Sequence, residues 1–191
     1  MIDTLAYWKD IDTQILFVIN GFHTSVLDTL MWWISDRYIW IPLYLTIAAL
    51  VIRRLGWTRG LCVIAVVIAV VSMTDYTSAS VLRPAVARLR PSAPDNPLSA
   101  ALHLVNGYRG GHYGFPSCHA ANSFALACYI SLMLHRRAIT LTLFLWTLIV
   151  SLSRIYLGVH YPSDILGGFL TGATIAYAGF LASRRLIRSS Y

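Results

Sequence analysis

Three separated stretches of this sequence concentrate arginines, histidines and a carboxylate, residue types that bind phosphate and act on it. Guanidinium groups match phosphate oxygens in bidentate geometry, and histidine serves as a nucleophile or as a general acid. The stretches are Arg83–Pro91, Phe115–His119 and Ser153–Asp164. Together they predict a strongly anion-attracting pocket that contains its own nucleophile, and therefore phosphoryl chemistry.

The two histidines have distinct expected roles. His160 precedes Asp164 by about one helical turn, so the carboxylate can fix the imidazole tautomer and leave the other ring nitrogen free to attack phosphorus. His119 can protonate the leaving alkoxide and later deprotonate the water that cleaves a phosphohistidine. This reaction contains no metal and needs no cofactor. Zinc ligation by these histidines and Asp164 is the alternative, disfavoured because the surrounding cations would repel a metal ion.

Helix starts add to the same expected pocket. Pro116 and Ser117 open an apolar segment, so the free N–H groups of that helix point towards an anion. Pro162 opens another apolar segment in the same way, with Asp164 in its first turn. A phosphoryl group held there would meet preorganised hydrogen-bond donors.

The three stretches resemble the tripartite signature of the type 2 phosphatidic acid phosphatase (PAP2) superfamily, which is written Lys-x6-Arg-Pro, Pro-Ser-Gly-His and Ser-Arg-x5-His-x3-Asp. Order and spacing agree, over residues from about 60 to 182. The membrane branch of this family is metal-independent and acts on lipid phosphates from the outer face. In this sequence the motifs read Arg83-x6-Arg90-Pro91, Pro116-Ser117-Cys118-His119 and Ser153-Arg154-x5-His160-x3-Asp164.

The resemblance also implies site roles. It makes His160 the nucleophile, Asp164 its orienting carboxylate and His119 the general acid. Two positions depart from the family pattern: Arg83 stands where lysine is usual, and Cys118 stands where glycine offers its backbone N–H to phosphate. The implied phosphate ligands are Arg83, Arg90, Ser117, Cys118 and Arg154.

The elements that must position these residues are membrane spans. The chain has 191 residues, of which 57% are hydrophobic and only 12% charged, about half the charged share of a soluble protein. We expect a single domain, residues 1–191, forming an all-α polytopic membrane bundle of five or six transmembrane helices. Five apolar stretches are the expected spans, at about 38–51, 61–82, 117–134, 138–152 and 162–182.

Two further segments complete the expected architecture. Residues 1–35 alternate apolar and polar groups, which favours amphipathic helices at the membrane surface, with one tilted span as the alternative. Residues 83–115 carry four prolines and four glycines, which predicts a long extracytoplasmic active-site loop.

Arginines set the expected orientation. They gather at one set of span ends without acidic neighbours, which places those ends in the cytoplasm and the three motifs on the outer face. The same rule explains the net charge of +7 without nucleic acid. We expect a bacterial cytoplasmic (inner) membrane, a periplasmic site and no requirement for oligomers. The arginines are Arg53, Arg54, Arg59, Arg136, Arg137, Arg184, Arg185 and Arg188.

Several other residues have ordinary expected roles. Arg88 and Arg109 are interpreted as interface arginines, and His23 and His135 as bystanders. Asp75, within the second span, is expected to hydrogen-bond Tyr76, Thr77 or a neighbouring helix. Substrate contact by His103 or His112 stays open, and Gly168 with Gly172 indicates close helix packing within one chain.

The predicted function is hydrolysis of a phosphomonoester or diphosphate on a membrane lipid through a phosphohistidine. Polyprenyl diphosphate, phosphatidylglycerophosphate, phosphatidate and lipid A phosphates all suit a basic outer-face pocket. One alternative is a lipid phosphotransferase that uses the same intermediate. The other is a protein that binds or translocates lipids without cleaving them.

Overall fold

The computed structural model describes the backbone of residues 4–188 and the side chains of residues 8–184. Within this range the chain is helical, and its one β-type pairing is an isolated bridge between Leu89 and Tyr113. In chain order the elements are α1 (Thr4–Gly21), α2 (Ser25–Ser35), η1 (Arg37–Trp40), α3 (Ile41–Leu55), α4 (Trp57–Tyr76), η2 (Thr77–Leu82), α5 (Arg83–Val86), η3 (Pro97–Ala101), η4 (Val105–Gly107), α6 (Cys118–Leu134), α7 (Arg137–Tyr156) and α8 (Pro162–Arg188).

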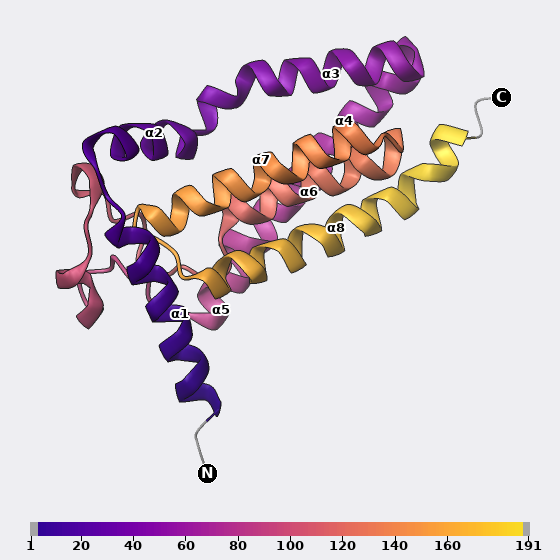
Figure 1. Cartoon of the computed structure of the whole chain (residues 1–191). Coiled ribbons are helices and arrows are strands. Elements are labelled where there is room, and N and C mark those ends of the chain that lie inside the picture. The colour runs from indigo at the N-terminus through magenta and orange to yellow at the C-terminus, as the bar shows by residue number, and fades with distance from the viewer. Residues whose placement is uncertain (1–3, 189–191) are drawn as a thin grey trace.

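The long apolar helices form a membrane bundle, as the sequence predicts (Figure 1). Four helical stretches are long and apolar enough to cross a bilayer, namely Arg37–Leu55, Trp57–Val86, Arg137–Tyr156 and Pro162–Arg184. The expected span at 117–134 is the shorter apolar helix α6, which has 17 residues. At 1.5 Å per residue it is about 25 Å long, just under the hydrocarbon thickness.

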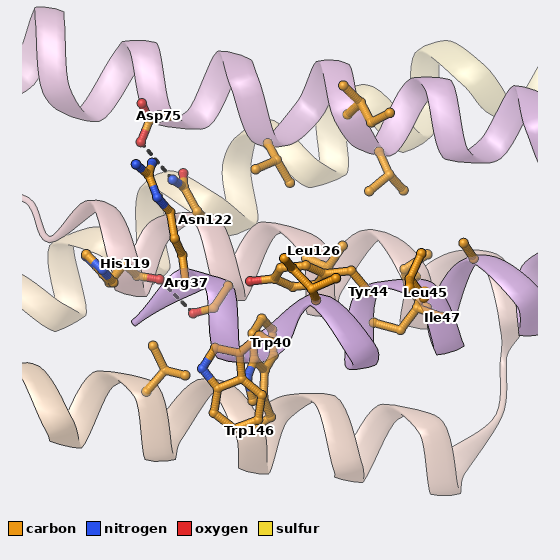
Figure 2. Close-up of a pocket in the computed structure, with 18 of the residues that line it drawn as sticks. Arg37, Trp40, Tyr44, Leu45, Ile47, Asp75, His119, Asn122, Leu126 and Trp146 are labelled. Atoms are coloured by element: carbon orange, nitrogen blue, oxygen red, sulfur yellow. Dashed lines mark hydrogen bonds between the residues drawn. The ribbon is translucent and has the colours of Figure 1, made fainter. Parts of the chain in front are cut away.

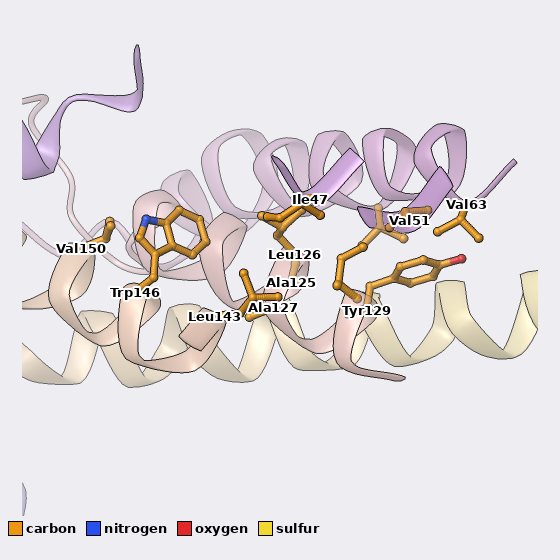
Figure 3. Close-up of a cluster of buried hydrophobic side chains, with 13 residues drawn as sticks. Ile47, Val51, Val63, Ala125, Leu126, Ala127, Tyr129, Leu143, Trp146 and Val150 are labelled. Carbon is orange, nitrogen blue, oxygen red and sulfur yellow. The ribbon is translucent and has the colours of Figure 1, made fainter. Parts of the chain in front are cut away.

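Helix α6 occupies the middle of the bundle. It packs against α4, α7 and α8, and eight of its residues are buried. Its Tyr129 and Ile130 lie in the main apolar cluster with residues of α3, α4 and α7 (Figure 3). A Cβ on Gly172 would lie 2.3 Å from the Ala121 carbonyl oxygen, so α6 and α8 touch backbone to backbone. This confirms close packing within one chain at the glycine pair.

The polar loop starts later than residue 83. Helix α4 continues through η2, a π-helical stretch, into α5, so the helix runs to Val86 and Arg83 lies on it. Pro84 lacks an N–H and the π-helical stretch before it loosens the ladder of hydrogen bonds, which lets the helix pass this residue. Ala87 then ends the helix with a positive φ of 48°. The expected loop at 83–115 therefore begins at residue 87.

Residues before the first long span form two helices. The axes of α1 and α2 meet at 116°, and by length and composition the pair is a candidate for one broken span or a re-entrant loop. Leu16 of α1 is fully buried. Asn20 ties α1 to the rest of the chain, because its amide donates to the carbonyl oxygens of His103 and Tyr156. An interfacial position for these helices stays a prediction.

The arginine-rich ends gather at one end of the bundle. The α3–α4 turn, the α6–α7 turn and the end of α8 lie together at one side of Figure 1, and residues 87–117 lie at the other. Arg53, Arg54 and Arg59 flank the first of these turns. Arg136 and Arg137 flank the second, and the side chains of Arg185 and Arg188 lie outside the described part.

Candidate active site

His160 lies in the short α7–α8 connection and is almost wholly buried. Its Nδ1 is 3.3 Å from Asp164 Oδ2, and the Arg90 guanidinium lies 2.9 Å from its Nε2. An arginine N–H only donates, so Nε2 accepts and carries the lone pair. The proton is therefore on Nδ1, where Asp164 accepts it. This is the tautomer that a nucleophilic Nε2 requires.

Asp164 is held in place from several sides. Its side chain is fully buried, and Oδ2 accepts the backbone N–H of Tyr161 as well as the His160 ring N–H. Its Oδ1 accepts from Arg88 at 2.9 Å. Its backbone carbonyl accepts the N–H of Ser117, which joins the start of α8 to the start of α6. A backbone hydrogen bond thus holds the third motif against the second.

Arg90 links the first motif to the third. The antiparallel bridge beside it positions this residue, and its guanidinium donates to the carbonyls of Tyr113 and Val159 as well as to His160. Burial, together with the charges of Arg83 and Arg154, lowers the pKa of Arg90 to about 10, so Arg90 is still a cation at neutral pH.

The same surroundings keep His160 neutral. Burial and the nearby charges of Arg90, Arg154 and Arg83 hold its pKa well below the ordinary value. Three guanidiniums with mutually repelling charges thus surround a neutral imidazole. An oxyanion placed among them would relieve that repulsion.

We call the space bounded by His160, Arg83, Arg90 and Arg154 the cup. His119 and Ser117 lie beside it, at the start of α6. The charges of Arg154 and Arg90 act on the His119 ring, which also lies near His160, and the backbone of Ser35 is its hydrogen-bond partner. Ser117 is the N-cap residue but its side chain makes no capping hydrogen bond. The first-turn N–H groups of a helix have no intrahelical acceptor. Both residues are therefore placed to contact a bound oxyanion.

Unpartnered polar atoms gather in the cup. In the described part of the chain, the buried side-chain atoms without a hydrogen-bond partner include Ser117 Oγ, Arg83 Nε and Arg154 Nε. Native proteins leave few such groups, and an unmade hydrogen bond of a buried charge is costly. These three unpartnered atoms come from three motifs, and a common ligand with several acceptor oxygens best explains them.

The first motif and the second also meet at Cys118. Arg83 donates to the Sγ of Cys118 at 2.8 Å and to the Pro116 carbonyl at 3.4 Å. Arginine in place of lysine and cysteine in place of glycine therefore contact each other in this chain. Arg154 is fixed from another direction, through the hydroxyls of Ser35 and Tyr108.

Arg88 is not an interface arginine, and this expectation is wrong. It donates to Asp164 at 2.9 Å and to Asp12 of α1 at 2.6 Å, and it lies over the Tyr161 ring. Asp12 also accepts the backbone N–H of Ser163. Arg88 therefore bridges the N-terminal helix to the carboxylate behind His160. In the sequence, only the proximity of Arg88 to Arg90 indicated a position near the site, and no pattern indicated that Asp12 takes part.

Other loop residues hold the loop together. Arg109 donates to the Ser92 carbonyl and the Ser99 hydroxyl, so it too is structural rather than interfacial. His103 contacts the Asp28 carboxylate and stacks on His23. His112 lies 3.8 Å from Asp95.

A groove of about 690 Å³ adjoins the cup (Figure 2). Residues of η1 and α3 form one wall, and residues of α4, α6 and α7 form the others. Along α6 its lining runs at four-residue spacing through Cys118, Asn122, Leu126 and Ile130, so the groove starts beside His119 and continues into the apolar core.

Comparisons with known proteins agree with this geometry. A lipid A 4'-phosphatase of Bacteroides thetaiotaomicron is 37% identical over 182 residues, 95% of this chain and 81% of that protein. An undecaprenyl-diphosphatase of Sulfolobus acidocaldarius is 30% identical over 181 residues, 87% of this chain and 75% of that protein. The crystal structure of a transmembrane PAP2-type phosphatidylglycerolphosphate phosphatase from Bacillus subtilis superposes with a TM-score of 0.69 at 23% identity, covering 96% of this chain and 89% of that one.

The family model described as the PAP2 superfamily matches residues 59–188, which include all three motifs. That match and the 37% identical relative together show the family of this chain. The chain belongs to the PAP2 superfamily and is a membrane phosphatase that acts on the phosphate bonds of lipids.

Proposed function

We propose that this lipid phosphatase hydrolyses a phosphomonoester of a lipid A-type glycolipid through a phosphohistidine at His160. The observation that carries the mechanism is the buried His160, whose Nε2 lone pair faces Arg90 while Nδ1 is held by Asp164. The substrate class follows the relative with 37% identity, which is a lipid A 4'-phosphatase.

The reaction proceeds in two steps. A phosphate oxygen takes over the Arg90 N–H, which frees Nε2 of His160 to attack phosphorus. The P–O bond to the lipid breaks, and His119 donates its proton to the departing sugar oxygen. Water deprotonated by His119 then attacks the phosphohistidine, breaks the P–N bond and releases inorganic phosphate. Arg83, Arg154 and Ser117 bind the oxygens on which negative charge is spread.

The groove supports a lipid substrate. An amphiphile can keep its hydrocarbon chains in the membrane and in the apolar groove while its phosphate reaches the arginines. The groove wall includes Trp40, Ile47 and Leu126, and it reaches His119 and Cys118 at its polar end. A substrate without a hydrocarbon tail would leave this wall in contact with water.

The sidedness supports an outer-face site. The arginine-rich turns lie at the opposite end of the bundle from the cup (Figure 1). Positively charged loops stay in the cytoplasm. We therefore place the cup on the periplasmic face of a bacterial inner membrane.

The test measures phosphate release by purified protein from lipid A 4'-phosphate, phosphatidate, phosphatidylglycerophosphate and a polyprenyl diphosphate. We expect the highest kcat/KM on the lipid A phosphate, and a loss of about 1,000-fold or more in His160→Ala. Full activity of His160→Ala would overturn the mechanism. Phosphate that appears on a second lipid instead of in solution would make the protein a phosphotransferase. Chelators should leave the rate unchanged.

A further inference from the structure

Asp75 is an exposed carboxylate whose charge the catalytic mechanism does not use. It lies within the Trp57–Val86 span, lines the groove and accepts a hydrogen bond from Asn122 Nδ2 of α6 at 2.8 Å. The expected bond to a neighbouring helix is thus confirmed. A carboxylate in a membrane span is expensive, and such residues generally face a functional cavity. One amide hydrogen bond does not use the acceptor capacity of a carboxylate.

Two further polar groups face the same part of the groove. Asn122 Oδ1 is buried and has no partner in the described part of the chain. Figure 2 shows Arg37 reaching from η1 across the groove towards Asp75 and Asn122. The three groups supply a cation, an anion and a neutral acceptor from three different elements. This mixed set suits a ligand that presents both hydroxyl or amide donors and acceptors.

The position of these groups relative to the cup decides which ligand they suit. Asn122 lies one helical turn along α6 from Cys118, and Leu126 and Ile130 follow at the next turns. The polar groups therefore lie between the phosphate cup and the apolar part of the groove. In a polyprenyl phosphate, hydrocarbon begins immediately beside the phosphate and would cover the Asp75 carboxylate. Covering a charge with hydrocarbon is unfavourable.

We propose that Asp75, Asn122 and Arg37 form a subsite for the sugar ring of a phosphorylated glycolipid. Ring hydroxyl and amide N–H groups donate to Asp75 and to Asn122 Oδ1, and Arg37 donates to a hydroxyl or carbonyl oxygen of the ligand. The acyl chains then continue along Leu126 and Ile130. This inference rests on the proposed phosphatase function and deepens it, because it assigns the selection of a glycolipid to three named side chains.

The experiment compares kcat/KM for lipid A 4'-phosphate with kcat/KM for a polyprenyl phosphate in the same detergent micelles. Asp75→Asn and Asn122→Leu should each reduce the ratio of the two values about tenfold, since a hydrogen bond to a charged or buried group is removed. Most of the change should appear in KM for the glycolipid. The exchanged pair Asp75→Asn with Asn122→Asp restores an amide and a carboxylate in contact, and should recover part of the ratio.

Asp95→Asn is the matched control, because Asp95 is an exposed carboxylate of the outer loop that does not line the groove. Its ratio should equal that of the wild type. An unchanged ratio in both Asp75→Asn and Asn122→Leu, with active and folded protein, would overturn the subsite. The proposed function fails differently, because wild-type protein would then release no phosphate from the glycolipid.

Discussion

Removal of the Ser117 hydroxyl tests whether this group binds phosphate or stabilises the folded protein. It is buried and has no partner among the described residues, so its removal breaks no hydrogen bond within the protein. Ser117→Ala should therefore leave thermal stability unchanged and lower kcat/KM by about 100- to 1,000-fold, the range for losing one donor to a developing oxyanion. Phosphate release and thermal unfolding in detergent measure the two effects.

Ser123→Ala on the same helix is the matched control for Ser117→Ala. Ser123 lies one helical turn after His119, but its hydroxyl is taken up within its own helix, where it donates to the His119 and Ala120 carbonyls. It should retain activity close to wild type. A loss of stability in Ser117→Ala with unchanged kcat/KM would show that the hydroxyl is structural and does not bind phosphate.

The neutral state of His160 has a consequence for stability. Its pKa in the folded protein is lowered by burial and by Arg90, Arg154 and Arg83, whereas an unfolded histidine titrates near 6.5. As the pH falls below about 6.5, the unfolded chain therefore takes up a proton that folded His160 does not, and the folded state loses stability. His160→Asn should lose less of its melting temperature between pH 7.5 and pH 5 than the wild type does.

Exposed His135 offers the matched control for this pH effect. It ends α6 with a φ of 47°, a conformation that asparagine also adopts, so His135→Asn should fold normally. Its melting temperature should fall with pH as in the wild type. Equal pH dependence in wild type and His160→Asn would contradict the buried, neutral state of His160.

At the scale of elements, Arg88 ties α1 to Asp164, the carboxylate that contacts His160. The guanidinium bridges Asp12 of α1 and Asp164 of α8 through two different nitrogens, a planar geometry that a lysine ammonium does not reproduce. Arg88→Lys should lower kcat about tenfold or more, because Asp164 and hence the His160 ring lose orientation. KM should change little, since Arg88 is not aimed at the phosphate.

Asp12→Asn weakens the contact of Arg88 with α1 and should also lower kcat. Asp10→Asn is its matched control, because Asp10 lies on the same helix, is exposed and hydrogen-bonds only Gln14 among the contacts described. A rise in KM with unchanged kcat in Arg88→Lys would make Arg88 a substrate ligand instead of a positioning residue.

The contact between α6 and α8 depends on glycine. A side chain at Gly172 would place its Cβ 2.3 Å from the Ala121 oxygen and 3.0 Å from the Ala125 nitrogen, both backbone atoms of α6. Gly172→Val should force the helices apart and lower the melting temperature by several degrees. Gly111→Ala, where nothing lies within 4 Å, should not. Equal melting temperatures for the two variants would contradict the close packing.

Sequence reasoning reached the elements and the motif residues but not their long-range partners. Span positions follow from local hydropathy, and the contact between His160 and Asp164 follows from a four-residue spacing. The bridge from Asp12 to Asp164 joins residues more than 150 positions apart, and no local pattern encodes it. The continuation of α4 past Pro84 was also hidden, because proline and the arginines after it have the composition of a loop.

At the scale of the whole molecule, the arginine-rich turns and the phosphate cup lie at opposite ends of one bundle. Arg53, Arg54, Arg136 and Arg137 lie at turns at one end, and the phosphate cup lies at the other (Figure 1). The largely apolar groove adjoins the cup and continues between the apolar helices, which suits the proposed lipid substrate. This arrangement requires a fixed orientation, because a cup in the cytoplasm would face a different pool of lipids.

The orientation can be tested with single cysteines. In a chain whose native cysteines are replaced by alanine, Asp95→Cys lies in the loop at the cup end of the bundle and Arg136→Cys lies at the α6–α7 turn, and both positions are exposed. In intact spheroplasts, a membrane-impermeant maleimide should label Asp95→Cys fully. It should label Arg136→Cys only after the membrane is permeabilised, because positively charged loops stay inside. The reverse pattern would place the cup in the cytoplasm and exclude a periplasmic substrate.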